Sequence, residues 1–161
     1  MAERILSTSS AYTEAWGQRL GALLAPGDKV ALTGPLGAGK TQLVRGVVAG
    51  YFGVGHTARV CSPSFTVMNT YDFGAKRVHH MDLYRLNSVD DLESTGYWDA
   101  LAESPAVVLI EWLAQVPEAR PEGCLELGID FVPDAVEART FSLLGDVSAT
   151  WRDRLAEIWG P

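Results

Sequence analysis

The segment from Gly34 to Thr41 constrains the fold of this chain more than any other part of the sequence. Its residues, Gly-Pro-Leu-Gly-Ala-Gly-Lys-Thr, match the pattern G-x-x-x-x-G-K-[ST], which has structural meaning only between a strand and a helix. Lys29–Thr33 is a short apolar run typical of a buried strand, and Lys40–Tyr51 has apolar side chains at helical spacing. The sequence therefore predicts a strand, a glycine-rich loop and a helix in succession.

The remaining segments predict further strands and helices around this unit. Ser10–Leu24 has apolar residues at helical spacing, and Gly53-Val54-Gly55 is expected to end the helix that follows the loop. This order predicts an α/β fold, the three-layer P-loop NTPase fold, with a central, mostly parallel sheet and antiparallel strands at one edge. The other expected elements are a hairpin of Phe65–Tyr71 and Arg77–Asp82, a helical stretch Asp90–Leu101, a strand Ala106–Ile110, a hairpin of Leu125–Phe131 and Arg139–Leu144, and a helix Ser148–Trp159.

Length and composition limit the class of protein. With 161 residues, of which 47% are hydrophobic, the chain is expected to form a single domain over residues 1–161. Its formal charge of -7 repels a phosphate backbone, so any contact with RNA is expected to be made through a partner. No apolar run approaches the ~18 residues that span a bilayer, and no signal peptide is found, which predicts a cytoplasmic protein without a membrane segment.

Each residue type in the glycine-rich loop has a physical purpose. Gly34, Gly37 and Gly39 allow positive φ and a close approach of the backbone, so that successive N–H groups form an anion-binding nest at a helix N-terminus. Lys40 adds a cation for the β- and γ-phosphates, and the hydroxyl of Thr41 can bind magnesium. The loop therefore predicts a site for ATP and Mg²⁺.

Two acidic residues that end predicted strands are candidates for the chemistry beside this loop. Glu111 follows Ala106–Ile110 directly, where a carboxylate completes the magnesium shell in such folds, although an ordinary surface glutamate would also fit the sequence. Asp82 ends another strand and is followed by Arg85. Asp82 can position water or a metal ion, and a structural salt bridge with Arg85 explains the same residues equally well.

Hydroxyl and imidazole groups give weaker signals. Ser62, Ser64 and Thr66 lie beyond the expected helix, where nucleotide-sensing segments occur in related folds, but hydroxyl-rich segments are also ordinary loops. His79 and His80 are adjacent on a predicted strand, so their side chains point to opposite faces and cannot bind one ion together.

Four short motifs together suggest a family. They are Leu36-Gly37-Ala38-Gly39-Lys40-Thr41, Ser62-Pro63-Ser64-Phe65-Thr66, His80-Met81-Asp82-Leu83-Tyr84-Arg85-Leu86 and Glu111-Trp112. Their order and spacing, from Ser7 to about Leu144, resemble the TsaE (YjeE) family, the P-loop ATPases of bacterial tRNA threonylcarbamoyladenosine synthesis. Pro35, Gln42 and Ser64 depart from the usual residues of that family, and none of these changes removes a group that the mechanism needs.

The resemblance implies a magnesium-dependent ATPase that works with TsaB and TsaD, meets tRNA only through that complex and turns over slowly alone. It implies Lys40, Asp82 and Glu111 as catalytic residues, and Thr41, Glu111 and Asp82 as residues near the metal. It also implies that the nucleotide is bound by Ser10, Thr13, Gly37, Ala38, Gly39, Lys40, Thr41, Gln42, Trp112 and Arg139.

Two other classes of function remain open at this point. A small-molecule kinase would use the same phosphate-binding loop, but such kinases usually carry an arginine-bearing lid, and no arginine cluster of that kind is found. A nucleotide-dependent regulatory switch would bind without needing turnover, and the absence of an N-K-x-D motif argues against GTP as its ligand.

Overall fold

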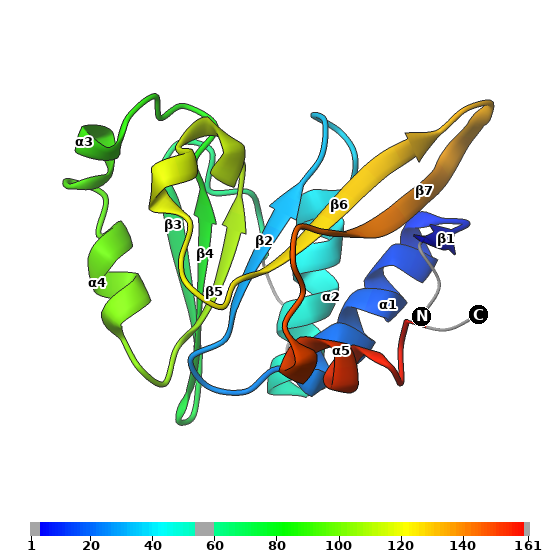
Figure 1. Ribbon diagram of the computed structural model, residues 1–161, viewed down its shortest axis with the longest axis horizontal. Helices are drawn as coiled ribbons and strands as arrows, with labels where there is room; N and C mark the ends of the chain where they lie inside the picture. Colours follow the sequence, from blue (N-terminus) through cyan, green and yellow to red (C-terminus); the bar gives the residue numbers. More distant parts are fainter. Residues whose placement is uncertain (1–3, 54–59, 160–161) are drawn as a thin grey trace.

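The computed structural model describes residues 4–53 and 60–159, which form a seven-stranded sheet in the order β1-β7-β6-β2-β5-β4-β3 (Figure 1). The central strands β6, β2, β5 and β4 are parallel, and antiparallel pairs lie at both edges. The sheet is therefore mostly parallel at its centre and antiparallel at its edges, as predicted, although the antiparallel strands lie at both edges rather than at one. The strands are β1 (Arg4–Ser7), β2 (Lys29–Thr33), β3 (Met68–Phe73), β4 (Lys76–Asp82), β5 (Val107–Glu111), β6 (Leu125–Val132) and β7 (Ala135–Leu144).

Helices cover both faces of this sheet. Side chains alternate along β2, so that Val30 and Leu32 join the hydrophobic cluster on one face while Ala31 joins the cluster on the other. The first cluster is completed by α1 (Ser10–Leu23), α2 (Lys40–Phe52) and α5 (Ala149–Leu155). The second is completed by α3 (Val89–Leu92), α4 (Tyr97–Ala102) and the 3₁₀ turns η1 (Leu113–Gln115) and η2 (Pro117–Ala119). This arrangement confirms the predicted three-layer α/β fold.

Helices α1 and α2 touch through their backbones. A Cβ atom added to Gly46 would lie 2.2 Å from the main-chain oxygen of Glu14, and one added to Gly50 would lie 2.0 Å from that of Gln18. Both distances are far below van der Waals contact, so only glycine fits at these positions. Glycine weakens a helix by about 1 kcal/mol relative to alanine, and the close packing offsets that cost. The start of α2 is thereby fixed against α1.

Several predicted boundaries differ from the structure. β1 was not predicted, because a four-residue strand with alternating burial carries little local signal. The predicted strand Phe65–Tyr71 begins only at Met68, because Phe65 lies in a turn with 85% of its surface exposed and Val67 has a φ of 66°. The closing helix ends at Leu155 rather than Trp159.

The end of α2 agrees with the sequence as far as it is described. Gly53 has a φ of 106° and its N–H donates to Ala49, which ends the helix, while Val54 and Gly55 lie outside the described residues. Within residues 4–53 and 60–159, no helix combines the length and the apolar character needed to cross a bilayer.

Candidate functional site

The carboxyl ends of three parallel strands meet at one edge of the sheet. Glu111, at the end of β5, lies opposite Leu32 of β2 on one side and opposite Asp82 of β4 on the other. The chain leaves β2 at Thr33, passes through the glycine-rich loop and enters α2 at Lys40. Register and connectivity thus bring the loop and both candidate carboxylates together, at the edge where ligands bind in parallel α/β sheets.

The glycine-rich loop has the backbone shape of an anion-binding nest. Gly37 and Gly39 have φ values of 79° and 98°, which L side chains rarely adopt. Apart from its chain neighbours, no heavy atom of the described residues lies within 4 Å of a Cβ built on Gly39, so the space beside this residue is open. Within the described part of the chain no side chain caps the N-terminus of α2, which leaves its leading N–H groups available to an anion.

Lys40 is a buried cation held by the loop itself. The residue is only 5% exposed, and its Nζ donates to the carbonyl oxygens of Gly34 at 2.7 Å and Pro35 at 2.9 Å. The ammonium also lies 4.3 Å from the centre of the Trp112 ring, a cation–π distance. Desolvation by burial lowers the pKa of Lys40, and the nearby carboxylates of Glu111 and Asp82 partly oppose this effect.

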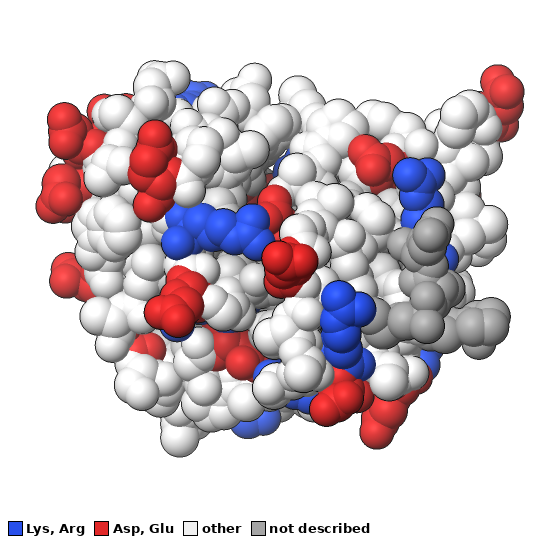
Figure 2. All heavy atoms as spheres, in the orientation of Figure 1, with Lys and Arg blue, Asp and Glu red and all other residues white. Residues whose placement is uncertain are grey.

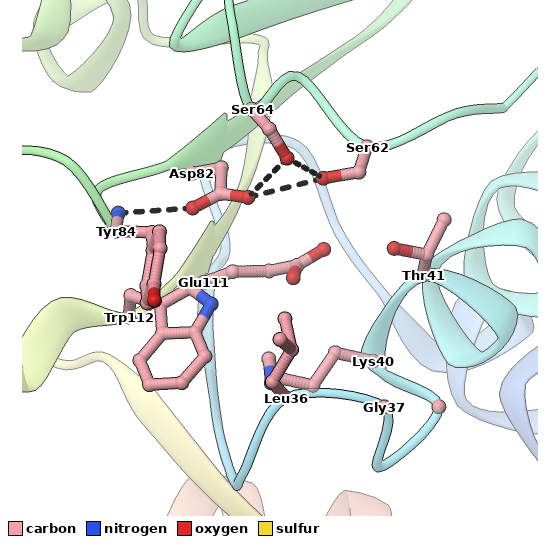
Figure 3. A pocket seen from close by; sticks show the side chains of 11 residues that line it. Leu36, Gly37, Lys40, Thr41, Ser62, Ser64, Asp82, Tyr84, Glu111 and Trp112 are labelled. Atoms are coloured by element: carbon pink, nitrogen blue, oxygen red, sulfur yellow. Dashed lines mark hydrogen bonds between the residues drawn. The ribbon is translucent and has the colours of Figure 1, made fainter.

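A cavity of about 330 Å³ opens above the loop, and Figure 3 shows the side chains that line it. Glu111 extends from β5 across the cavity toward Thr41 at the start of α2, with Lys40 below them and Ser62 above (Figure 3). The cavity is lined by Leu36, Gly37, Gly39, Lys40, Thr41, Ser62, Ser64, Asp82, Tyr84, Glu111 and Trp112.

Asp82 is held by the hydroxyl-rich loop. The hydroxyls of Ser62 and Ser64 donate to its Oδ2 at 3.0 and 3.3 Å, and the backbone N–H of Tyr84 donates to Oδ1 at 2.9 Å (Figure 3). Arg85 instead lies over the ring of Phe65, with its guanidinium carbon 4.5 Å from the ring centre. The salt-bridge interpretation of Asp82 and Arg85 was therefore wrong.

Glu111 is buried, so the alternative of an ordinary surface glutamate was also wrong. The residue is 3% exposed, and its Oε1 lies 2.7 Å from Nε2 of His80, which is fully buried. His79 points to the opposite face, as predicted, and meets Glu103 at 2.7 Å through its own Nε2. Sequence reasoning missed the contact of His80 with Glu111, because it depends on the pairing of β4 with β5.

A second, smaller cavity adjoins the first at Gly39. It has a volume of about 140 Å³ and lies between the start of α1, the loop and β7. Arg139 on β7 donates from Nε to the carbonyl oxygen of Ala38 at 2.9 Å, and the hydroxyl of Thr13 lies 2.8 Å from that of Ser7. The cavity is lined by Ser10, Thr13, Ala38, Gly39, Gln42, Val136, Glu137 and Arg139.

The residues that the resemblance assigns to catalysis, metal and nucleotide therefore all line one cavity or the other, whereas Gly34, Thr66 and Arg85 line neither. Gly37, Lys40, Thr41, Asp82, Glu111 and Trp112 border the larger cavity, and Ser10, Thr13, Ala38, Gln42 and Arg139 border the smaller, with Gly39 between them. Their roles toward a ligand stay predictions. The sequence analysis assigned no role to four residues of the site, Ser7, Leu36, Tyr84 and His80. For His80 alone the sequence held an indication, because it is two residues from Asp82 on the same strand and therefore shares its face.

The sheet topology and the glycine-rich loop define the class of protein, which is an α/β protein with the P-loop NTPase fold. The chain belongs to the TsaE family, because the family model described as Threonylcarbamoyl adenosine biosynthesis protein TsaE matches residues 7–141. Curated relatives agree with this assignment. The tRNA threonylcarbamoyladenosine biosynthesis protein TsaE of Synechocystis is 39% identical over 66% of this chain and 67% of its own length. The protein of the same name from Bacillus subtilis is 34% identical over 83% of this chain and 81% of its own.

The similarity extends to a solved structure. The crystal structure of Bacillus subtilis YdiB superposes with a TM-score of 0.75 at 27% sequence identity, and the match covers 96% of this chain and 92% of that one. The TsaE protein of Treponema pallidum, 34% identical over 81% of this chain, matches along 93% of its own length. The sequence comparison with the Bacillus subtilis protein thus covers 83% of the chain, and the fold comparison extends to 96%.

Proposed function

We propose that this chain binds ATP with Mg²⁺ and hydrolyses it as an accessory component of tRNA threonylcarbamoyladenosine biosynthesis, acting with TsaB and TsaD. Membership of the TsaE family supports the pathway. The single observation that carries the nucleotide part is the convergence of Lys40, Thr41 and Glu111 on one cavity at the N-terminus of α2.

The two cavities match the two halves of a nucleoside triphosphate. The larger one offers the phosphates a positive helix end and an ammonium group, which favour multiply charged anions. The smaller one lies between α1 and β7, next to the loop, and is proposed to receive the nucleoside. Because Gly39 borders both, a single ligand that passes over this residue can occupy both cavities.

The residues around the larger cavity also fit a magnesium ion. Glu111 has one carboxylate oxygen held by His80 and one that makes no hydrogen bond to another described residue, and it extends toward Thr41 (Figure 3). Magnesium is usually held by one or two such side chains together with phosphate oxygens and water. When bound, the ion supplies charge neutralisation and orientation to the phosphates. Among residues 4–53 and 60–159 no cluster of three or more acidic, histidine or cysteine side chains forms a separate metal site.

The chain's own groups divide the remaining work. Lys40 exchanges its carbonyl partners for phosphate oxygens and stabilises the charge that develops on them. Asp82 is fixed by Ser62 and Ser64 on one oxygen and by a backbone N–H on the other, so its carboxylate is oriented to position an attacking water molecule. The rings of Tyr84 and Trp112, 4.8 Å apart, wall the site and limit the access of other water.

The charge distribution supports an indirect relation to tRNA. Figure 2 shows acidic side chains along the edge formed by α3 and α4, while basic side chains on this face are scattered among acidic ones. With a net charge of -7, the chain has no excess of cations to neutralise a phosphate backbone. TsaB and TsaD are therefore proposed to make the tRNA contacts.

The test is nucleotide binding and turnover with and without the partners. Calorimetry is expected to show Mg²⁺-dependent ATP binding that exceeds GTP binding, and ATP hydrolysis is expected to rise when TsaB and TsaD are added. A pull-down with both partners is expected to depend on the nucleotide. Lack of ATP binding by the folded chain would refute the proposal.

Two outcomes would redirect the proposal. Efficient phosphate transfer to a small acceptor would identify a kinase instead. If Glu111→Ala and Asp82→Ala variants supported tRNA modification fully, nucleotide binding without hydrolysis would suffice, and the chain would be a regulatory module.

A further inference from the structure

His80 is a buried imidazole to which neither the sequence analysis nor the proposed nucleotide contacts assign a role. The residue is fully buried, and its Nε2 lies 2.7 Å from Oε1 of Glu111. On the other side of the ring, Nδ1 lies 3.5 Å from the hydroxyl of Tyr71, which donates a hydrogen bond of 3.4 Å to the carbonyl oxygen of Cys61. The imidazole therefore stands between a candidate metal-site carboxylate and the loop that carries Ser62.

Strand register explains why His80 reaches Glu111. His80 and Asp82 are two residues apart on β4, so both side chains project from the same face of the sheet. Asp82 pairs with Glu111 across the parallel strands β4 and β5, which places His80 one step behind that pair. The His80 ring therefore contacts the Glu111 carboxylate from the interior of the protein, and the other side of this carboxylate faces the cavity.

We propose that His80 is a positioning residue, which holds the carboxylate of Glu111 so that its second oxygen faces Thr41 and a magnesium ion between them. This inference rests on the proposed function, since it assigns a supporting residue to the same site. Carboxylates that bind metal ions are themselves held by hydrogen bonds, and the loss of such a supporting partner typically costs ~10–100-fold in metal affinity or activity.

The hydrogen-bonding roles follow from the partners. A carboxylate only accepts hydrogen bonds, so Nε2 of His80 bears a hydrogen and donates it in the hydrogen bond to Glu111. In a neutral ring Nδ1 is then an acceptor, and it shares the single proton of the Tyr71 hydroxyl with the carbonyl oxygen of Cys61. Without His80, the carboxylate of Glu111 would lose its only hydrogen-bond partner among the described residues, and this flexible side chain would no longer keep one orientation.

A structural role alone would affect stability, whereas a positioning role affects magnesium affinity selectively. Two amide variants separate these roles. His80→Gln places an amide N–H where Nε2 stands and can still donate to Glu111, whereas the shorter side chain of His80→Asn cannot reach it. His79→Asn is the matched control, because His79 is on the same strand and also contacts a glutamate, but on the opposite face.

The experiment measures the binding of a fluorescent ATP analogue by the full chain during a magnesium titration and in excess chelator. His80→Asn is expected to raise the half-saturating magnesium concentration ~10–100-fold. His80→Gln is expected to stay within about threefold of the wild type, and His79→Asn to leave the value unchanged. Affinity in chelator is expected to be the same for all of them, because no amide or ammonium contact to phosphate is altered.

Other results overturn the inference. An unchanged magnesium requirement in His80→Asn, or equal shifts in the Asn and Gln variants, would show that His80 does not position Glu111. If His80→Asn does not fold, as judged by thermal unfolding, His80→Leu, which suits an apolar interior, takes its place. If the wild-type chain binds the nucleotide without any response to magnesium, both the metal part of the proposed function and this inference are refuted. If the wild type responds to magnesium and all variants respond in the same way, the inference alone is refuted.

Discussion

Replacing Lys40 by methionine separates two effects of the buried ammonium group, its effect on the free energy of unfolding and its effect on the affinity for the nucleotide. The ammonium makes charge-assisted hydrogen bonds to Gly34 and Pro35 and a cation–π contact with Trp112. Each hydrogen bond contributes about 1.5–3 kcal/mol and the ring about 1–2 kcal/mol, while desolvation of the charge costs several kcal/mol. These contributions nearly cancel. The free energy of unfolding of the Lys40→Met variant is therefore expected to stay within about 1.5 kcal/mol of the wild type.

Binding of the nucleotide is expected to respond very differently. In the proposed complex the ammonium of Lys40 meets phosphate oxygens, and methionine offers no donor in its place. The ammonium gives up neutral carbonyl oxygens for charged phosphate oxygens, which form stronger hydrogen bonds, and the difference of about 1.5–3 kcal/mol corresponds to a rise of roughly ten- to a hundredfold in Kd. Calorimetric titration with ATP and magnesium, alongside urea unfolding of the same protein, measures both quantities.

Lys76→Met is the matched control for Lys40→Met. Nζ of Lys76 also donates to a carbonyl oxygen, that of Tyr51 at 2.6 Å, and lies 4.8 Å from the centre of the same residue's ring. It stands at the far end of α2 from the loop, so its replacement is expected to leave the Kd within about twofold. A folded Lys40→Met protein with the affinity of the wild type would refute the assignment of the site.

Three further predictions concern other parts of the molecule. Gly50→Ala is expected to lower the free energy of unfolding by about 1–3 kcal/mol, measured by urea denaturation, because its Cβ would collide with the backbone of α1; an unchanged value would contradict the close packing of the two helices. Burial raises the pKa of Cys124 from 9.0 to about 11, so the stability that this thiol contributes is present below pH 9 and lost as the pH rises to 11, by about 2 kcal/mol. Cys124→Ala is expected to flatten that decline in unfolding curves recorded across this range, and an unaltered slope would refute it. In the Ser62→Ala, Ser64→Ala double variant, Asp82 loses both hydroxyl donors, and kcat of ATP hydrolysis is expected to fall at least about tenfold with little change in nucleotide affinity; equal losses in both would place these serines in binding instead.

The strand–loop–helix unit could be predicted because its signals are local. The glycines, Lys40 and Thr41 stand at fixed offsets, and the buried strand and the amphipathic helix beside them are visible in short windows of sequence. The pairing of β1 was beyond such reasoning, because Ile5 finds its partner Phe141 near the other end of the chain. Its four residues become a strand only when β7 is in place.

Other differences arise where tertiary packing overrides local preference. The alternation that predicted a strand from Phe65 is broken by the left-handed conformation of Val67, which a β-branched residue adopts only when its surroundings impose it. The opposite directions of His79 and His80 followed from strand geometry, but their partners did not. Which carboxylate each ring meets depends on the register between β4 and β5 and on the position of α4.

The backbone contact between α1 and α2 also limits how the molecule can open. The N-terminus of α2 lines the larger cavity and that of α1 lines the smaller. The close contacts of Gly46 and Gly50 with α1 therefore fix the distance between these two helix ends. Neither helix can slide or lean toward the other without an atomic collision. Any widening of the two cavities must therefore come from the opposite walls, which include Ser62 and the β6–β7 hairpin that carries Arg139.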